Sequence, residues 1–168
     1  LEGRKFWILG LLPLQREQLL RGKLAFAITG SLFLSCSIIL LSDVLLGMPL
    51  VAVGVHLFTM ICLAVGLSGL SVGISAWLPN FRETDPSKIV LGFGGTINML
   101  AGLAYLVFVI VAACGPFHLA SAAATFEEEQ RSFPNWGFAG LPVALLLAIL
   151  ATWLPLRFGS RTFRRMEF

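Results

Sequence analysis

Apolar residues are gathered into four long runs that are separated by short polar segments. The runs cover residues 24–45, 50–78, 89–114 and 138–156 and are 19 to 29 residues long. A helix rises ~1.5 Å per residue, so about 20 apolar residues cross the ~30 Å hydrocarbon layer of a bilayer. The pattern therefore predicts four transmembrane helices and an all-α, integral membrane helical bundle, whose transmembrane domain covers residues 24–156.

Composition and charge support a membrane protein and predict its orientation. The chain is 57% hydrophobic and 12% charged, whereas about a quarter of the residues of a soluble domain are charged. Eleven of the twelve Lys and Arg residues lie on the side of the N-terminus, and only Arg131 lies on the other side. Positive charge collects on the cytoplasmic side of membrane proteins. We therefore expect a multi-pass protein of the inner (cytoplasmic) membrane with both termini in the cytoplasm and no affinity for nucleic acid.

The segments at the two ends of the chain are expected to be cytoplasmic. Residues 1–23 form an amphipathic segment in which Pro13 suits the first turn of a helix that runs to Lys23. Such a helix would lie on the membrane surface. If it continued unbroken into the first span it would act as a lever, whereas a break near Gly22 would act as a hinge. Residues 157–168 form a basic tail.

The inner half of the second span has one small face and one bulky face. Small residues let helix backbones approach closely inside a membrane. The small face should therefore contact another helix, and the bulky face should contact lipid. The small face is formed by Gly66, Gly69, Gly73 and Ala76, and the bulky face by Leu67, Leu70, Ile74 and Trp77.

The segment between the third and fourth spans is expected to lie outside the membrane. Residues 115–137 include an alanine-rich stretch with high helix propensity, followed by aromatic residues that suit a membrane interface. A helical extracytoplasmic excursion before the last span is therefore predicted.

Candidate catalytic chemistry is weak in this chain. There is no GxxxxGK[ST] phosphate loop and no ligand spacing typical of a metal site. Ser68 lies in a GxSG sequence, but His56 is ~18 Å away along the same helix, too far for a general base. We expect no catalytic residue, no metal and no cofactor, and we expect the three cysteines to be packing residues.

Two polar residues inside the spans are candidates for a translocation pathway. Asp43 falls near the outer end of the first span, and Asn98 lies near the middle of the third. An interhelical hydrogen bond is the simplest role for Asn98. His56 is expected to be a polar residue packed between helices, and His118 an interfacial residue.

Two stretches of the sequence resemble bacterial ABC exporter permeases of the type 2 class. The first is Leu1-Glu2-Gly3-Arg4-Lys5-Phe6-Trp7-Ile8-Leu9, with Pro13-Leu14 and Glu17-Gln18-Leu19-Leu20-Arg21-Gly22-Lys23 after it. The second is Leu78-Pro79-Asn80-Phe81 followed by Asp85-Pro86-Ser87-Lys88-Ile89. The resemblance covers the rest of the chain more loosely.

The resemblance implies a permease that is not itself an enzyme and that couples to a separate ATP-binding subunit. ATP and Mg would bind to that subunit. The chain would supply the last four spans of a six-span unit, and the remaining spans or a second permease unit would complete the pathway. The residues implied to contact the ATPase are Pro13, Arg16, Glu17, Gln18, Arg21 and Lys23, with Phe81, Arg82, Glu83 and Asp85 in a smaller second contact.

Two other functions are compatible with the sequence. A secondary transporter would show an inverted repeat and helices broken near the middle of the membrane. The glycines at 92, 94 and 95 hint at such a break, but the two halves of the chain do not repeat each other. The other alternative is a membrane scaffold or assembly protein that transports nothing, and copurification of an ATPase would separate the permease from both.

Overall fold

A computed structural model describes residues 16–78, 92–126 and 135–165 of the chain. These residues form four α-helices and one short 3-10 helix: α2 (Arg16–Leu45), α3 (Leu50–Trp77), α5 (Phe93–Phe126), η2 (Asn135–Phe138) and α6 (Gly140–Arg165). All four α-helices are long and apolar enough to cross a membrane. The predicted all-α fold with four spans is confirmed.

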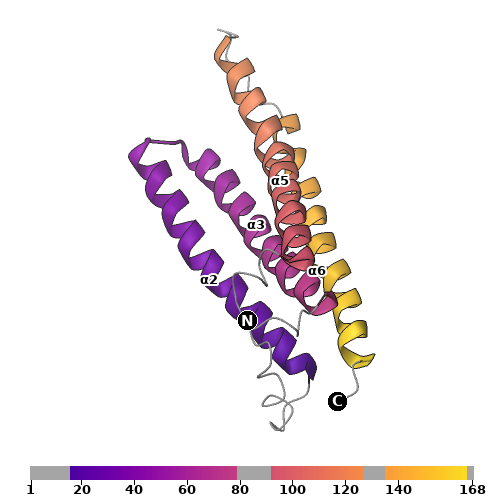
Figure 1. Ribbon diagram of the computed structural model, residues 1–168. Coiled ribbons are helices and arrows are strands. Elements are labelled where there is room, and N and C mark those ends of the chain that lie inside the picture. The colour runs from indigo at the N-terminus through magenta and orange to yellow at the C-terminus, as the bar shows by residue number, and fades with distance from the viewer. Residues whose placement is uncertain (1–15, 79–91, 127–134, 166–168) are drawn as a thin grey trace.

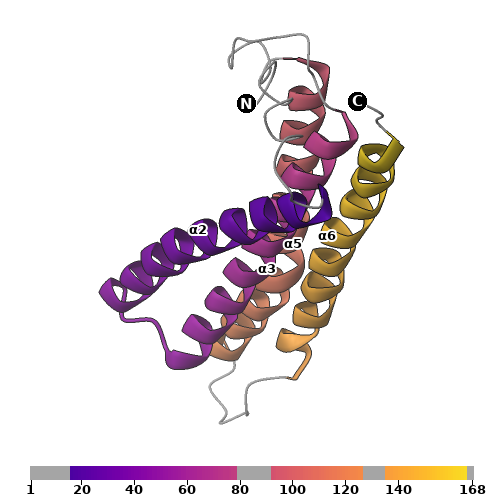
Figure 2. The same ribbon diagram turned by 90° about the horizontal axis from the view of Figure 1, so that it is seen from below.

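Helix α3 is the centre of the bundle, and α2, α5 and α6 pack around it (Figure 1). Helix α2 lies to one side, against α3, whereas α5 and α6 pack on α3 and on each other (Figure 2). The two ends of the bundle differ in charge. We call the end at which α2 begins and α6 finishes the basic end, because Arg21, Lys23 and Arg157 lie there.

The opposite end, here called the hairpin end, holds the tight turn between α2 and α3. Gly47 adopts a φ of 62°, which is costly for a residue with a side chain. Its N–H donates to the carbonyl of Val44 at 3.2 Å, and the Met48 N–H donates to the carbonyl of Asp43 at 3.0 Å. This pair of bonds is the Schellman arrangement that ends helices at a glycine. Pro49 then precedes the first residue of α3.

Helix α5 is longer than the sequence predicts, because the third span and the start of the excursion form one helix. It runs without interruption through Pro116 to Phe126. Proline has no N–H, so the carbonyl of Ala112 loses its usual helical donor. The backbone of Gly140 in α6 lies against this carbonyl, where a larger residue would collide with it. Transmembrane helices tolerate proline more readily than helices of soluble proteins do.

The small face of α3 packs against neighbouring helices, as predicted. Gly66, Gly69, Gly73 and Ala76 are all buried. A Cβ atom at Gly69 would lie 2.5 Å from the Cα of Thr152 in α6, and Gly159 of α6 rests on the backbone of Gly73. The α3 and α6 backbones are therefore in direct contact.

The prediction for the bulky face of α3 is wrong at Ile74. This side chain is 7% exposed, whereas Trp77 is 49% exposed. Leu67 and Leu70 are partly buried against the core. Because α3 has a helix on three sides, much of the circumference of its inner half contacts protein, and of the four bulky residues only Trp77 is exposed.

Large apolar side chains cover the outside of the bundle. Phe26 on α2 is 83% exposed and Leu50 at the start of α3 is 86% exposed. Exposed apolar surface on this scale is rare on water-soluble monomers. Together with the helix lengths, it identifies lipid as the surroundings of a multi-pass membrane protein.

Candidate functional site

The segment implied to contact an ATPase is partly described, and its described part belongs to a spanning helix. Helix α2 begins at Arg16 and passes through Gly22 into the membrane span without a break. The separate surface helix that the sequence predicts is not present in residues 16–23, which form the first two turns of α2. This is the lever arrangement rather than the hinge. A Cβ atom at Gly22 would meet nothing within 4 Å, so packing does not require a glycine here.

The remaining residues of the two implied contacts lie outside the described part of the chain. They are Pro13 in the first contact and Phe81, Arg82, Glu83 and Asp85 in the second. Gln18, Arg21 and Lys23 are exposed on α2. The basic end therefore presents polar and charged side chains on a helix that is continuous with the apolar bundle.

A cavity of about 670 Å³ lies between α2, α3 and α6. Its walls are mostly apolar, and Arg21 and Arg157 line it at the basic end. The Arg157 guanidinium lies 4.7 Å from the centre of the Trp153 ring, a cation–π contact. Neither of the two candidate pathway residues, Asp43 and Asn98, lines this cavity.

Asn98 makes the interhelical contact that is the simplest role for it. Its Nδ2 donates to the hydroxyl of Ser71 on α3 at 3.5 Å, the long limit for such a bond. Ser68 is likewise a packing residue, since its hydroxyl lies 3.4 Å from that of Ser31 on α2. Both contacts tie α3 to a neighbouring helix.

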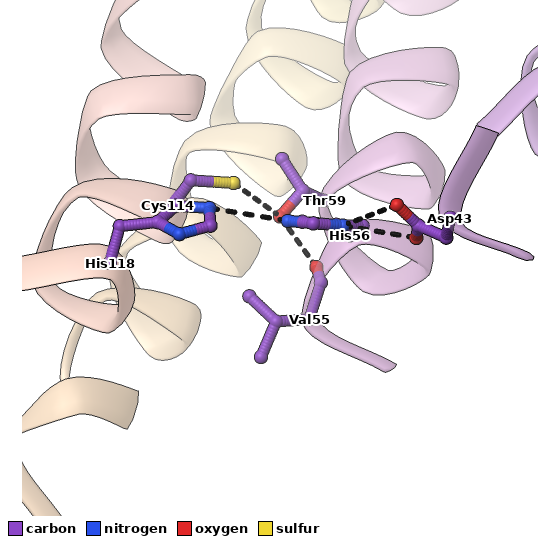
Figure 3. Close-up of polar contacts among 6 residues, drawn as sticks. All are labelled: Asp43, Val55, His56, Thr59, Cys114 and His118. Carbon is purple, nitrogen blue, oxygen red and sulfur yellow. Dashed lines mark hydrogen bonds and ion pairs between the residues drawn. The ribbon is translucent and has the colours of Figure 1, made fainter. Parts of the chain in front are cut away.

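Asp43 is more deeply buried than its position near the end of the first span predicts. The residue is 2% exposed. Both of its carboxylate oxygens lie 3.0 Å from Nδ1 of His56 on α3 (Figure 3). A buried carboxylate is costly unless it is paired and hydrogen-bonded, and His56 supplies that partner across the hairpin.

His118 of α5 extends this contact to a third helix. Its Nε2 lies 3.2 Å from Nε2 of His56, so the three side chains form one row across the hairpin end (Figure 3). The Thr59 hydroxyl lies one turn further into α3, where it donates to the Val55 carbonyl and contacts the Cys114 thiol at 3.6 Å. We call Asp43, His56 and His118 the outer polar row.

The sequence indicates that two of the three residues in the outer polar row lie close together. Asp43 and His56 both lie within two helical turns of the tight turn at residues 47–49, so two antiparallel helices bring them to the same end of the bundle. His118 lies in a segment that the sequence assigns to the excursion, and only the continuous α5 places it there. No group of three or more His, Cys, Asp or Glu side chains in the described residues could hold a metal ion.

Comparison with known proteins gives one finding. The family model described as "Putative ATP-binding cassette" matches residues 1–168, the whole chain. No curated protein and no solved structure gives a match. A match over the full length includes the charged first turns of α2, the bundle and the basic tail together. The chain therefore belongs to this ATP-binding cassette family.

Proposed function

We propose that this chain is the membrane permease of an ATP-driven exporter, which forms part of the translocation pathway and is powered by a separate ATPase subunit. The observation that carries the proposal is membership of an ATP-binding cassette family over a chain that has no phosphate loop. The family supports ATP-driven transport as the context, and we propose that ATP hydrolysis takes place on another chain, because a phosphate loop is the usual cradle for ATP.

The shape of α2 supports a coupling role for its first turns. Residues 16–23 and the first span belong to one helix, so a displacement of the charged turns would be carried into the bundle. Helix α2 is also the helix with the fewest neighbours, since it packs mainly on α3. A helix at the edge of the bundle moves at a smaller cost in packing than one in its centre.

The sign of the charges distinguishes docking from simple attachment to lipid. Lys and Arg beside a span would bind anionic headgroups without any partner protein. Glu17, however, gains nothing from such a surface. A docking surface uses complementary charges of both signs, and Arg16, Glu17 and Arg21 provide both on neighbouring turns of the segment.

The orientation follows from the distribution of basic residues. The basic end, with both termini, faces the cytoplasm, and the hairpin end faces the opposite side of the inner membrane. The ATPase would then meet α2 in the cytoplasm, where ATP is available. The cavity beside α2, between α3 and α6, is the place where movement of α2 would change the bundle most.

The test is copurification of the permease with a phosphate-loop ATPase, sought first among the products of the neighbouring genes. Glu17→Lys should weaken the complex about tenfold, which corresponds to about 1.4 kcal/mol, because it reverses one charge of the docking surface. Membrane insertion should be unchanged, since the substitution lies outside the hydrocarbon layer. Glu167→Lys makes the same change of charge in the C-terminal tail, outside residues 1–23, and is the matched control, so it should copurify normally.

The competing interpretation makes the opposite prediction. A segment that only attaches to lipid would bind the membrane surface equally well, or more tightly, after Glu17→Lys. If this variant still binds the ATPase at the wild-type level, also when Arg16 and Arg21 are reversed, the coupling assignment is wrong. Failure of the wild-type chain to bind any ATPase would favour the secondary transporter or the scaffold.

A further inference from the structure

The outer polar row runs from the interior of the bundle to its surface. Asp43 on α2 is 2% exposed, the His56 side chain on α3 is 13% exposed, and His118 on α5 is exposed. Each side chain comes from a different helix, and each hydrogen-bonds the next (Figure 3). The row therefore connects a buried carboxylate to the surroundings through two imidazoles.

The chemistry of the groups fixes where the protons lie. An ionised carboxylate only accepts hydrogen bonds, so the His56 Nδ1 that faces both Asp43 oxygens carries a proton and donates it. The two Nε2 atoms at 3.2 Å can bond only if one proton lies between them. When both rings are neutral, His118 donates this proton and the bare Nε2 of His56 accepts it.

The row can take up one further proton without losing any of these bonds. If His56 becomes an imidazolium, it donates from both nitrogens, to Asp43 and to a bare Nε2 of His118. If His118 becomes the imidazolium, its second N–H points away and its Nε2–H still donates to His56. In both cases one proton lies between the rings, and the carboxylate of Asp43 balances the added charge.

A second added proton cannot be accommodated in the same way. Two imidazolium rings would direct two N–H groups at each other across 3.2 Å, and Asp43 can balance only one of the two positive charges. Like charges so close together in a partly buried site repel strongly. His118 must then turn away, which removes the hydrogen bond between the two imidazoles and leaves the weaker Thr59–Cys114 contact to join α3 and α5 in the described residues at this end.

Few other charges bear on this end of the bundle. The remaining titratable group there in the described residues is the Cys114 thiol of α5, which already contacts Thr59. The described parts of η2 and α6 carry no Asp, Glu, His, Lys, Cys or Tyr, and Arg157 of α6 lies at the basic end. Glu127, Glu128, Glu129 and Arg131 lie outside the described residues.

We propose that Asp43, His56 and His118 form a proton-binding site that holds α2, α3 and α5 together at the hairpin end. The site binds one proton with all its hydrogen bonds intact and loses the His56–His118 bond when it binds a second. Imidazole is the side chain suited to binding and releasing a proton near physiological pH, which is the chemistry that the site requires. The proposal does not depend on the ATPase.

Nitrogen NMR of the full chain in lipid bilayers tests the site directly. The chain contains two histidines, so labelling with ¹⁵N-histidine reports on these two rings alone. At pH 8 we expect two neutral rings of different tautomer and a signal that couples the two Nε2 atoms. As the pH falls, one ring should become charged while the coupling persists, and the coupling should vanish when both are charged.

Three variants separate a proton site from a chance contact. Asp43→Asn removes the balancing charge, so uptake of the first proton should move to lower pH by about one unit. His118→Gln should leave His56 to titrate in a single step with no ring-to-ring coupling. Leu119→Gln changes an exposed neighbour of His118 and should leave both steps unchanged.

Two results would overturn the proposal. One is independent titration of the two rings with no Nε2 coupling at any pH, or an unchanged titration in Asp43→Asn. The other is displacement of the shared proton by micromolar Zn²⁺ at pH 7, reversed by a chelator, because two imidazole nitrogens also bind transition metals. The second result would make the row a metal site instead.

Discussion

Glycine at positions 69 and 73 lets the backbone of α6 approach that of α3 closely enough for direct contact. A Cβ atom at Gly73 would lie 2.5 Å from the carbonyl carbon of Pro155 and 2.8 Å from the nitrogen of Leu156. Backbone atoms cannot move aside as the end of a flexible side chain can. Even one added methyl group would therefore separate the two helices.

We expect Gly69→Ala to lower the stability of the folded protein by about 1–3 kcal/mol, the usual cost of overpacking. Gly69→Leu should prevent folding or assembly altogether. Gly54→Ala on the same helix is the matched control, because a Cβ atom there meets nothing within 4 Å. Thermal unfolding in detergent measures the difference, and equal melting temperatures for the Gly69→Ala and Gly54→Ala variants would contradict the contact.

The hydroxyl of Tyr105 provides a second test at the level of a single residue. Tyr105 of α5 is 7% exposed, and its hydroxyl donates to the Cys62 carbonyl of α3 at 2.7 Å. Tyr105→Phe keeps the ring and removes the hydrogen bond, so we expect it to lower the free energy of unfolding by about 1 kcal/mol. Tyr105→Ala also removes the ring and leaves a cavity in the core, so it should lower the free energy of unfolding by about 3–5 kcal/mol. A Phe variant as stable as the wild type would show that the hydroxyl contributes nothing.

Single residues were predictable from the sequence where one helix alone sets their environment. The small face of α3 follows from helical periodicity, and this prediction is confirmed at Gly66, Gly69 and Gly73. The environment of Ile74 was not predictable, because it depends on how many helices surround α3. For the same reason the sequence does not reveal that His56 and His118 meet.

At the scale of single helices, the proposed coupling role rests on α2, because only a continuous helix would transmit force as a rigid rod. The helix has 30 residues and no proline. Gly22 is the one position in its first turns at which a break would be natural, since glycine weakens helices by about 1 kcal/mol relative to alanine. The structure keeps this position helical.

A lever and a hinge respond differently to substitutions at Gly22. If α2 transmits force as a rigid rod, Gly22→Ala should leave ATPase stimulation by the permease unchanged, and Gly22→Pro should abolish it by breaking the helix. Proline costs about 3 kcal/mol inside a helix. The measurement is ATP hydrolysis by the partner subunit in proteoliposomes. A hinge would instead be impaired by Gly22→Ala, because alanine stiffens the joint.

Helix existence was predictable from the sequence, but some helix ends were not. Long apolar runs predict spans because a bilayer sets a minimum length, and all four spans are confirmed by length and composition. The sequence predicts that the third span ends at residue 114, yet α5 continues through Pro116 to Phe126. The backbone of Gly140 in α6 lies against the Ala112 carbonyl at this point, a tertiary contact that local sequence does not reveal.

At the scale of the whole molecule, the ends of α5 and α6 determine the topology. The late part of α5 lies at the hairpin end, and the last turns of α6 lie at the basic end (Figure 1). Ser121→Cys and Ser160→Cys should therefore be labelled from opposite sides of the membrane by an impermeant reagent. Native cysteines are first replaced by serine or alanine. Labelling of both positions from one side would contradict four spans.

One part of the arrangement of the whole molecule can be predicted from the sequence, and another part cannot. The number of spans and the expected orientation follow from hydrophobicity and charge. Packing between helices places α3 at the centre of the bundle and α2 at its side. This packing depends on which small and large residues meet where two helices are in contact. Those contacts involve residues far apart in the sequence, such as Gly69 and Thr152.

The most direct measurement of the central claim is site-specific photocrosslinking in membranes that contain the permease and its ATPase. A photoreactive amino acid replaces Gln18 at the basic end of α2 or, as a control, Val44 at the hairpin end of the same helix. Both side chains are exposed. The account predicts a crosslink to the ATPase from position 18 and none from position 44. Crosslinks from position 18 to lipid alone, or to the ATPase from position 44, would contradict it.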